Sequence, residues 1–157
     1  MSSQNKINFN WKKFDQLSNE DLYAVASLRQ KVFVVEQNCP YLDLDYSDQE
    51  AMHLLGFKDN SLVVYLRAFP PDIKYKGSSL GRIVVDESER NNGHGELITK
   101  MGIDYLQKNF PESEIVISAQ HRLMEFYQAL GFVPRGSIYL EDDIDPVSYT
   151  HLTLPTT

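Results

Sequence analysis

The hydrophobic and polar positions at the start of the chain predict a strand followed by a helix. Ile7, Phe9 and Trp11 alternate with polar residues, which is typical of a β-strand with one buried face. Ser18 precedes Asp21 by three residues, a spacing that signals a helix start, and apolar residues then recur at helical intervals. We therefore expect a short first strand that leads into a helix.

The pattern of the next segment changes from helical to extended. The β-branched run Val32–Val35 predicts that the helix gives way to extended chain before Glu36. The polar stretch Asn38–Glu50 contains a proline and is typical of a loop. His53–Phe57 and Leu62–Phe69 flank a turn-prone tetrapeptide, and this arrangement predicts a β-hairpin.

The second half of the chain alternates strands and helices. Strands are expected at Leu80–Asp86, Glu114–Ala119 and Val133–Tyr139, and helices at Gly95–Asn109 and Arg122–Leu130. Proline and glycine residues mark the ends of both helices. The predicted order β-α-β-β-β-α-β-α-β describes one mixed α/β domain.

Composition and charge narrow the class of protein. The chain has 157 residues, 42% of them hydrophobic, which suits one domain with a substantial core. Asp and Glu outnumber Lys and Arg by 22 to 15, so a nucleic acid is not expected as the main partner. The longest apolar run, Leu62–Leu66, is far shorter than the ~18 residues of a membrane helix, and Met1–Asn8 does not resemble a secretory signal. We expect a cytoplasmic monomer or homodimer without membrane contact.

Neither a metal site nor a reactive thiol is expected. No His, Cys and carboxylate cluster has metal-ligand spacing, and Cys39 lacks an activating partner. The acidic run Asp43–Glu50 resembles an EF-hand only in its charge, because the sixth position is Asp48 in place of glycine. We interpret the run as a solvated loop that favours a cationic ligand.

The last twelve residues differ in character from the rest. Pro146–Thr157 contains no Asp, Glu, Lys or Arg, five Ser or Thr residues and no periodic pattern. It resembles a read-through translation of a sequencing adapter, so we expect a non-native tail after a domain spanning residues 1–145. The alternative is a natural terminal strand, for which Val147, Tyr149 and Leu152 have suitable spacing.

One stretch between a predicted strand and helix suggests anion binding. Arg90 begins the pattern R-x-x-G-x-G, which ends at Gly95. Gly93 and Gly95 let the backbone approach a ligand, while free amides and the dipole at the helix start face an anion. Arg90 adds a cation, so the stretch suits a pyrophosphate, although an ordinary turn with a solvated arginine is equally compatible.

A second motif follows the strand Glu114–Ala119. Phe126 and Leu130 lie four residues apart, so both are expected to face the core, and Gly131 reverses the chain so that Phe132 packs back. Tyr127 lies one position off this apolar face, where its hydroxyl can reach the seam between strands. Taken alone, a tyrosine here is most often a packing residue.

With both motifs in this order, the sequence resembles the GNAT superfamily of N-acetyltransferases, and specifically its ElaA-like branch. The matching positions are residues 28–29, 32–41, Asp45, Asp48, 53–54, 81–85 and 119–120, within a resemblance that covers about residues 11–145. The branch usually ends in a strand with an Ile-x-His-x-x-Met pattern, and here the tail replaces it after the acidic residues 141–143.

The resemblance implies a single-domain α/β fold with a mixed central sheet, a splayed parallel strand pair and flanking helices. Acetyl-CoA is implied as co-substrate, with pantetheine between the two parallel strands and pyrophosphate in the glycine loop. The implied cofactor contacts are Ile83, Val84, Val85, Arg90, Asn91, Asn92, Gly93, His94, Gly95 and Gln120.

The implied reaction is acetyl transfer to a primary amine of a small molecule or peptide by direct attack. Tyr127 is the candidate general acid for the departing thiolate. Glu36 is a candidate general base, and a purely structural role for its carboxylate is an equally good interpretation. The acceptor side is expected to contain Glu36, Tyr41, Asp45, Asp48 and His53. A non-catalytic acyl-CoA-binding sensor or interaction module is the alternative function.

Overall fold

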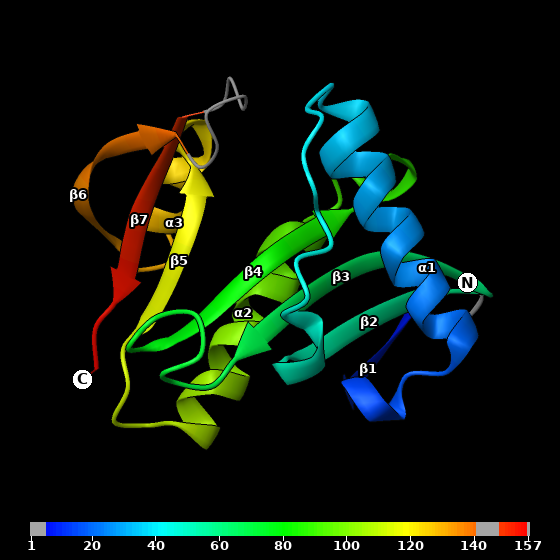
Figure 1. Cartoon of the computed structure of the whole chain (residues 1–157), viewed down its shortest axis with the longest axis horizontal. Helices are drawn as coiled ribbons and strands as arrows, with labels where there is room; N and C mark the ends of the chain where they lie inside the picture. Colours follow the sequence, from blue (N-terminus) through cyan, green and yellow to red (C-terminus); the bar gives the residue numbers. More distant parts are fainter. Residues whose placement is uncertain (1–5, 141–147, 157) are drawn as a thin grey trace.

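The computed structural model describes residues 6–140 and 148–156, and these residues form a seven-stranded mixed sheet flanked by helices (Figure 1). The strands are β1 (Ile7–Lys13), β2 (Met52–Lys58), β3 (Ser61–Phe69), β4 (Ser78–Val85), β5 (Ile115–Gln120), β6 (Val133–Leu140) and β7 (Ser148–Leu154). The helices are α1 (Asn19–Arg29), α2 (His94–Asn109) and α3 (Met124–Gln128). The sheet order is β1-β2-β3-β4-β5-β7-β6.

The expected start of α1 is confirmed in atomic detail. The Ser18 hydroxyl accepts a hydrogen bond from the Asp21 amide at 2.9 Å, and the Asp21 carboxylate accepts one from the Ser18 amide at 3.1 Å. This reciprocal pair satisfies two amides that a helix start otherwise leaves without partners. The helix is thus fixed at its first turn.

The expected extended chain at Val32–Val35 is wrong. The chain continues from α1 as a π-helical segment, η3 (Gln30–Glu36). Val32 packs with Val25 and Leu28 in one buried cluster against the sheet. Burial of this apolar face outweighs the weak preference of β-branched residues for strands.

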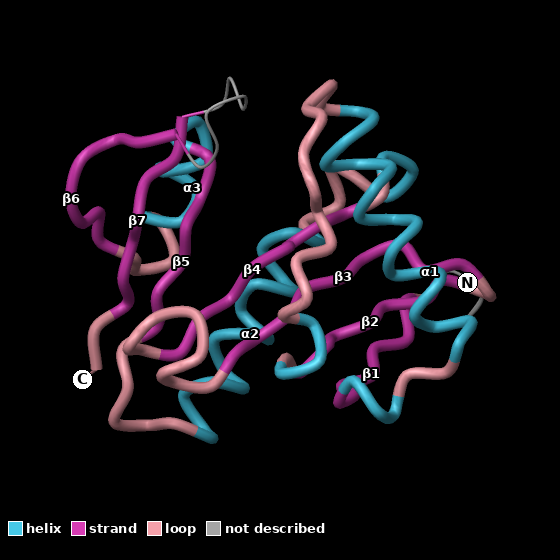
Figure 2. Tube along the Cα trace, viewed as in Figure 1, coloured by secondary structure: helices cyan, strands magenta, loops and turns pink. Residues whose placement is uncertain are grey.

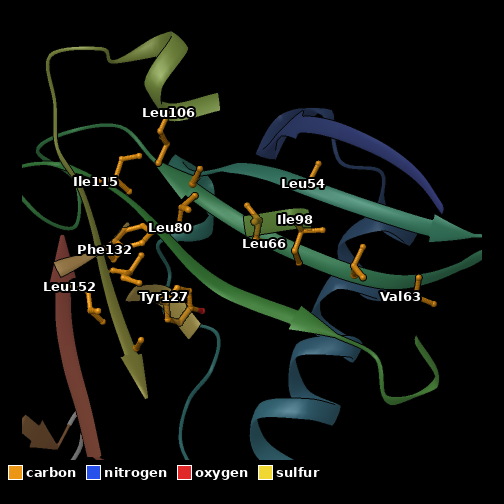
Figure 3. Close-up of a cluster of buried hydrophobic side chains, with 14 residues drawn as sticks. Leu54, Val63, Leu66, Leu80, Ile98, Leu106, Ile115, Tyr127, Phe132 and Leu152 are labelled. Atoms are coloured by element: carbon orange, nitrogen blue, oxygen red, sulfur yellow. The ribbon is translucent and has the colours of Figure 1, made fainter. Parts of the chain in front are cut away.

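The helices cover opposite faces of the sheet. On one face, α1 and η3 pack against Leu55, Tyr65 and Val84. On the other face, Ile98 and Leu106 of α2 lie in the main core, where they pack against the strand side chains that point away from α1 (Figure 3). Strand residues that alternate in sequence therefore enter two different cores, as the period of a strand requires. The β2–β3 hairpin is confirmed.

The two parallel strands separate soon after they meet. The pairing of β4 with β5 consists of Ser78 with Ile115 and Ser79 with Val116. Beyond these pairs the ribbons diverge in Figure 1, so the remaining edge of β4 is not paired with β5. The splayed parallel pair is therefore present, and it opens the sheet near its centre.

The tail contributes a strand that the domain boundary at residue 145 did not anticipate. β7 lies between β5 and β6, antiparallel to both, and Leu152 is fully buried in the main core. The expected order of elements therefore lacks one strand, because β7 follows β6, while the assignment of residues 146–157 to a non-native tail stays a prediction. The acidic segment 141–144 and the first tail residues, Pro146 and Val147, lie outside the described residues.

Candidate active site

A cleft of about 640 Å³ lies where β4 and β5 separate. Side chains from η3, both strands, the loop after β4, the start of α2 and α3 line it. The predicted residues that line it are Glu36, Tyr41, Ile83, Val84, Val85, Arg90, Asn91, Gly93, His94, Gly95, Gln120 and Tyr127. The structure thus brings most of the predicted cofactor residues together at one opening.

A bulge shapes the wall that β4 provides. Opposite β3, the register shifts between the pairs Tyr65–Val84 and Arg67–Gly81, and Arg82 adopts a left-handed conformation with φ of 51°. A bulge of this kind bends its strand and interrupts the regular ladder. Here the bend accompanies the divergence of β4 from β5 and lies within the cleft wall.

The glycine loop ends directly at the start of α2. Gly93 is the N-cap residue with φ of 78°, a conformation that costs glycine little, and Asn91 also has a positive φ of 65°. The first amides of the helix have no partners within it, and its dipole favours a negative charge there. Asn92 does not line the cleft, since its side chain amide points back to the Glu89 carbonyl at 3.4 Å.

Arg90 is already engaged with a carboxylate. Its two terminal nitrogens donate to the two oxygens of Glu36, and its Nε donates to the Val85 carbonyl at 3.1 Å. The hydrogen bond and charge of Arg90 hold the pKa of Glu36 below its usual value. Glu36 is therefore deprotonated at neutral pH. Its carboxylate is paired with Arg90, the residue that was predicted to bind the phosphate.

A second bridge crosses the cleft on the β5 side. Gln120, at the end of β5, donates through its amide nitrogen to Gln37 at 2.9 Å. The oxygen of the same amide accepts from Arg122 Nε at 3.0 Å. The residues Glu36 and Gln37 thus connect η3 to the loop after β4 and to the end of β5.

Tyr127 lies inside the core end of the cleft. Its ring is buried edge-on against Phe126 and Phe132, and its hydroxyl oxygen points away from β5 towards the β4 side in Figure 3. Burial raises the pKa of Tyr127 to about 12. The expectation that Phe126 faces the core is wrong, because Phe126 is 38% exposed and lines the cleft, while Tyr127 takes the buried position.

The acidic loop between η3 and β2 is not a solvated acidic surface. It crosses the sheet face beside α1 (Figure 2), and Asp43, Asp45 and Asp48 form ion pairs with arginines. Burial would raise the pKa of Asp45, but its hydrogen bonds to Arg67 outweigh burial and lower it. These three carboxylates anchor the loop, so they are not available to a cationic acceptor.

The proposed acceptor residues therefore fall into two groups. Glu36 and Tyr41 line the cleft, whereas Asp45, Asp48 and His53 do not. His53 is fully buried: its Nδ1 lies 2.5 Å from the Tyr65 hydroxyl and its Nε2 lies 2.9 Å from the Asp48 carbonyl. A neutral ring that donates through Nε2 and accepts at Nδ1 satisfies both contacts, and desolvation lowers the pKa of His53 accordingly.

Several lining residues were not predicted from the sequence. They are Val32, Phe33, Gln37, Leu80, Gly81, Arg82, Glu89, Ile117, Ser118, Ala119, Arg122, Leu123 and Phe126. Some lie in the matching segments 32–41, 81–85 and 119–120, and Phe126 lies in the second motif, so the family resemblance was the signal that could have found them. Within the described ranges, 6–140 and 148–156, no group of three His, Cys, Asp or Glu side chains could hold a metal ion. None of the helices in these ranges is long and apolar enough to cross a bilayer.

Comparison with known proteins identifies the class. Residues 16–152 match the acetyltransferase (GNAT) domain model, a match that extends into β7. A UPF0039 protein of Synechocystis is 38% identical over 144 residues, covering 91% of this chain and 94% of the relative. The chain therefore belongs to the GNAT acetyltransferase family, and the resemblance and the fold class expected from the sequence are confirmed.

Within the family, the chain is similar to the protein ElaA of Escherichia coli, to which it is 37% identical over 131 residues, 82% of this chain and 86% of ElaA. The crystal structure of ElaA superposes with a TM-score of 0.85 and 33% identity, covering 94% of this chain and 98% of ElaA. An acyl-CoA N-acyltransferase from Pseudomonas aeruginosa superposes with a TM-score of 0.87 and 30% identity, with coverages of 94% and 98%.

Proposed function

We propose that the protein transfers an acetyl group from acetyl-CoA to the primary amine of a small molecule or peptide. The observation that carries the proposal is the cleft between β4 and β5, whose lining includes both the first turn of α2 and Tyr127. The P. aeruginosa N-acyltransferase shares the complete fold, and a GNAT acetyltransferase from Elizabethkingia anophelis, similar in fold, has acetyl-CoA bound.

The residues of the cleft fit this co-substrate. The edge of β4 near Ile83–Val85 faces the cleft without a β5 partner. Apart from the Val85 carbonyl, which accepts from Arg90, its backbone groups suit a pantetheine chain that pairs like an added strand. The amides at the start of α2 suit the pyrophosphate, and Arg90 supplies a guanidinium. His94 and Gly95 lie in this first turn, so they contribute to pyrophosphate binding chiefly through their backbone amides.

Tyr127 is the residue that we assign as general acid. In the reaction, the amine nitrogen bonds to the thioester carbonyl carbon and the carbon–sulfur bond breaks. The departing thiolate accepts a proton from Tyr127, which recovers one from water, and the amine releases a proton to solvent or a base. A backbone amide at or beside Val85 would polarise the thioester carbonyl.

The raised pKa of Tyr127 shapes that role. A phenol with a pKa of about 12 stays protonated throughout the physiological range, so it is always a donor. A free thiol has a pKa near 8.5, so complete proton transfer in water would be uphill. The donor contribution is therefore greatest while the carbon–sulfur bond is breaking and negative charge develops on sulfur in an apolar cleft.

The experiment that tests the function measures release of free CoA thiol from acetyl-CoA in the presence of a panel of primary amines. Acceptor-dependent release is expected, with the acetylated amine detected by mass spectrometry. Binding of acetyl-CoA by calorimetry without release for any amine would favour the sensor alternative. Absence of acetyl-CoA binding would overturn the assignment of the cleft.

A further inference from the structure

The cleft holds a carboxylate at the place where the proposed function needs an anion from the ligand. Glu36 binds both terminal nitrogens of Arg90, and the remaining Nε is used by the Val85 carbonyl. Three of the five N–H donors of the guanidinium are thus used, one on each nitrogen, so each nitrogen pair that could bind an anion through two parallel hydrogen bonds is already engaged. A phosphate cannot form a paired contact with Arg90 unless Glu36 moves away.

We propose that Glu36 is a positioning residue that competes with the cofactor phosphate for Arg90 and, with Gln37, holds η3 across the cleft until the cofactor binds. This inference rests on the proposed function, because it needs an anionic co-substrate in the glycine loop. It assigns Glu36 to control of cofactor affinity, in place of the role of catalytic base.

The contacts that η3 makes across the cleft are of a kind that a bound ligand can replace. The Glu36 and Arg90 side chains are 34% and 36% exposed, and an ion pair so accessible to water is weak and readily replaced. The bridge from Gln37 to Gln120 is a single neutral hydrogen bond. Both bridges end on residues that line the cleft, so a ligand in the cleft acts on both.

A different contact anchors η3 independently of the cleft. Lys31 forms an ion pair of 2.8 Å with Asp86, just after β4. Neither Lys31 nor Asp86 lines the cleft, so this pair has no reason to break when the cofactor binds. Besides the burial of Val32 against the sheet, the segment therefore has one polar contact outside the cleft and two exchangeable ones inside it, and Lys31 provides a matched control for Glu36.

The local geometry allows the end of η3 to move. The segment is π-helical, a form that is often found at functional sites, and its last turn closes with Gln37 donating to the Val32 carbonyl at 3.2 Å. Asn38 then adopts a positive φ of 51°. Glu36 and Gln37 thus lie at the junction between a helix end and a loop, where small backbone changes suffice to redirect their side chains.

The test compares the binding of CoA, measured by calorimetry at low salt, in Glu36→Gln, Lys31→Gln and the unchanged protein. Glu36→Gln removes the competing charge and should tighten CoA binding about two- to five-fold, the factor that corresponds to an exposed ion pair. Lys31→Gln should change the affinity less and should not tighten binding, because Lys31 does not line the cleft and acts on Glu36 only through its charge. In an Arg90→Ala background the gain from Glu36→Gln should disappear, because the contested guanidinium is absent.

The outcomes separate this inference from the proposed function. If the unchanged protein binds CoA but Glu36→Gln binds it equally or more weakly, competition at Arg90 is excluded while the function stands. A large loss of turnover in Glu36→Gln at saturating substrates, without tighter binding, would assign the base role instead and overturn the inference. If no protein binds CoA, both the function and the inference are wrong.

Discussion

Arg67 on β3 donates a hydrogen bond of 2.7 Å to the carboxylate of Asp48, and both side chains are buried. The same Asp48 oxygen accepts from Arg29 of α1 at 2.8 Å. One carboxylate in the loop before β2 therefore balances two guanidiniums from different layers of the fold. The arrangement explains how a polar segment packs stably over the sheet beside the cleft.

Asp48→Asn should destabilise the protein strongly. The substitution keeps the shape but removes the carboxylate that two buried guanidiniums share. Arg29 keeps Asp43 and Arg67 keeps Asp45 as partners, so the cost should lie at or below the lower end of the about 3–5 kcal/mol lost when a buried charge has no partner left. Chemical denaturation should therefore show a large fall in the free energy of unfolding. Glu50→Gln, on the same turn but exposed, is the control and should change stability little. Similar stability of both variants would show that the network contributes nothing net.

His53 should make stability depend on pH below about 6.5. Desolvation lowers the pKa of His53 from 6.5, so the unfolded chain binds the proton first as pH falls. The stability from the neutral ring is complete above pH 6.5 and is lost as pH falls through the lower, folded-state pKa. The lowered pKa values of Asp45 and Asp48 act at lower pH, below about 4. His53→Gln should flatten the change in melting temperature between pH 7.5 and 5.5.

The sequence predicted the elements whose signals are local. The Ser18–Asp21 pair locates the start of α1, and the R-x-x-G-x-G pattern locates the loop before α2, because capping and sharp turns depend on adjacent residues. The family resemblance added the pairing of β4 with β5, which no local pattern specifies. Both kinds of information point to the same cleft.

The rest depends on partners that are distant in sequence. Whether Asp48 attracts a ligand or balances Arg29 and Arg67 is decided by folding, and the acidic run alone looks the same in both cases. Helical spacing likewise did not show that Tyr127, in place of Phe126, enters the core. Packing around a short helix chooses its buried face when its two sides differ little in hydrophobicity.

The tail residues should contribute to stability through β7. Leu152 is fully buried in the main core, so Leu152→Ala should lower the free energy of unfolding by about 2–5 kcal/mol. Val133→Ala on the neighbouring β6 removes a half-exposed side chain and should cost much less. Equal, small effects in denaturation experiments would show that residues 148–154 are dispensable, as expected of an adapter-derived tail.

Substitutions in the glycine loop should separate cofactor binding from folding. A Cβ at Gly95 meets no atom within 4 Å and requires no unusual backbone angle, so Gly95→Ala should fold normally while narrowing the approach to the α2 amides. Gly93 has φ of 78°, so Gly93→Ala adds backbone strain as well. We expect weaker acetyl-CoA binding in both variants and a lower melting temperature mainly in Gly93→Ala. Unchanged affinity in both would remove the glycine loop from the cofactor site.

Arg90→Ala should weaken acetyl-CoA binding, although Glu36 partly masks the loss. A charge-assisted contact with phosphate is worth about 1.5–3 kcal/mol. In the parent protein this contact forms only at the expense of the Arg90–Glu36 ion pair, so the net loss of binding free energy in Arg90→Ala should be smaller than the full value. The loss should shrink as salt rises, because screening weakens the contact in the parent protein. Calorimetry across a salt series measures both effects. Equal affinities at low salt would mean that Arg90 serves only its contacts with Glu36 and Val85.

Tyr127→Phe tests the proposed acid most directly. It removes one hydroxyl and keeps the ring between Phe126 and Phe132, so the fold should persist. With saturating amine, the turnover number should fall about 10²–10⁴-fold, the range for a positioned acid. Acetyl-CoA affinity should change little, since the hydroxyl acts mainly as charge develops on sulfur. No alkaline decline from this group is expected below about pH 11, given its pKa of about 12.

The leaving group distinguishes proton donation from simple packing. An acyl donor with a more acidic thiol needs less help from a proton donor, so the turnover lost in Tyr127→Phe should be smaller with that donor. A packing role predicts the same ratio of rates for both donors, and a binding role predicts weaker affinity at unchanged turnover. Rate and affinity must therefore be measured on the same samples. A turnover number within about two-fold of the parent would exclude Tyr127 as the acid, because a positioned donor contributes far more than that.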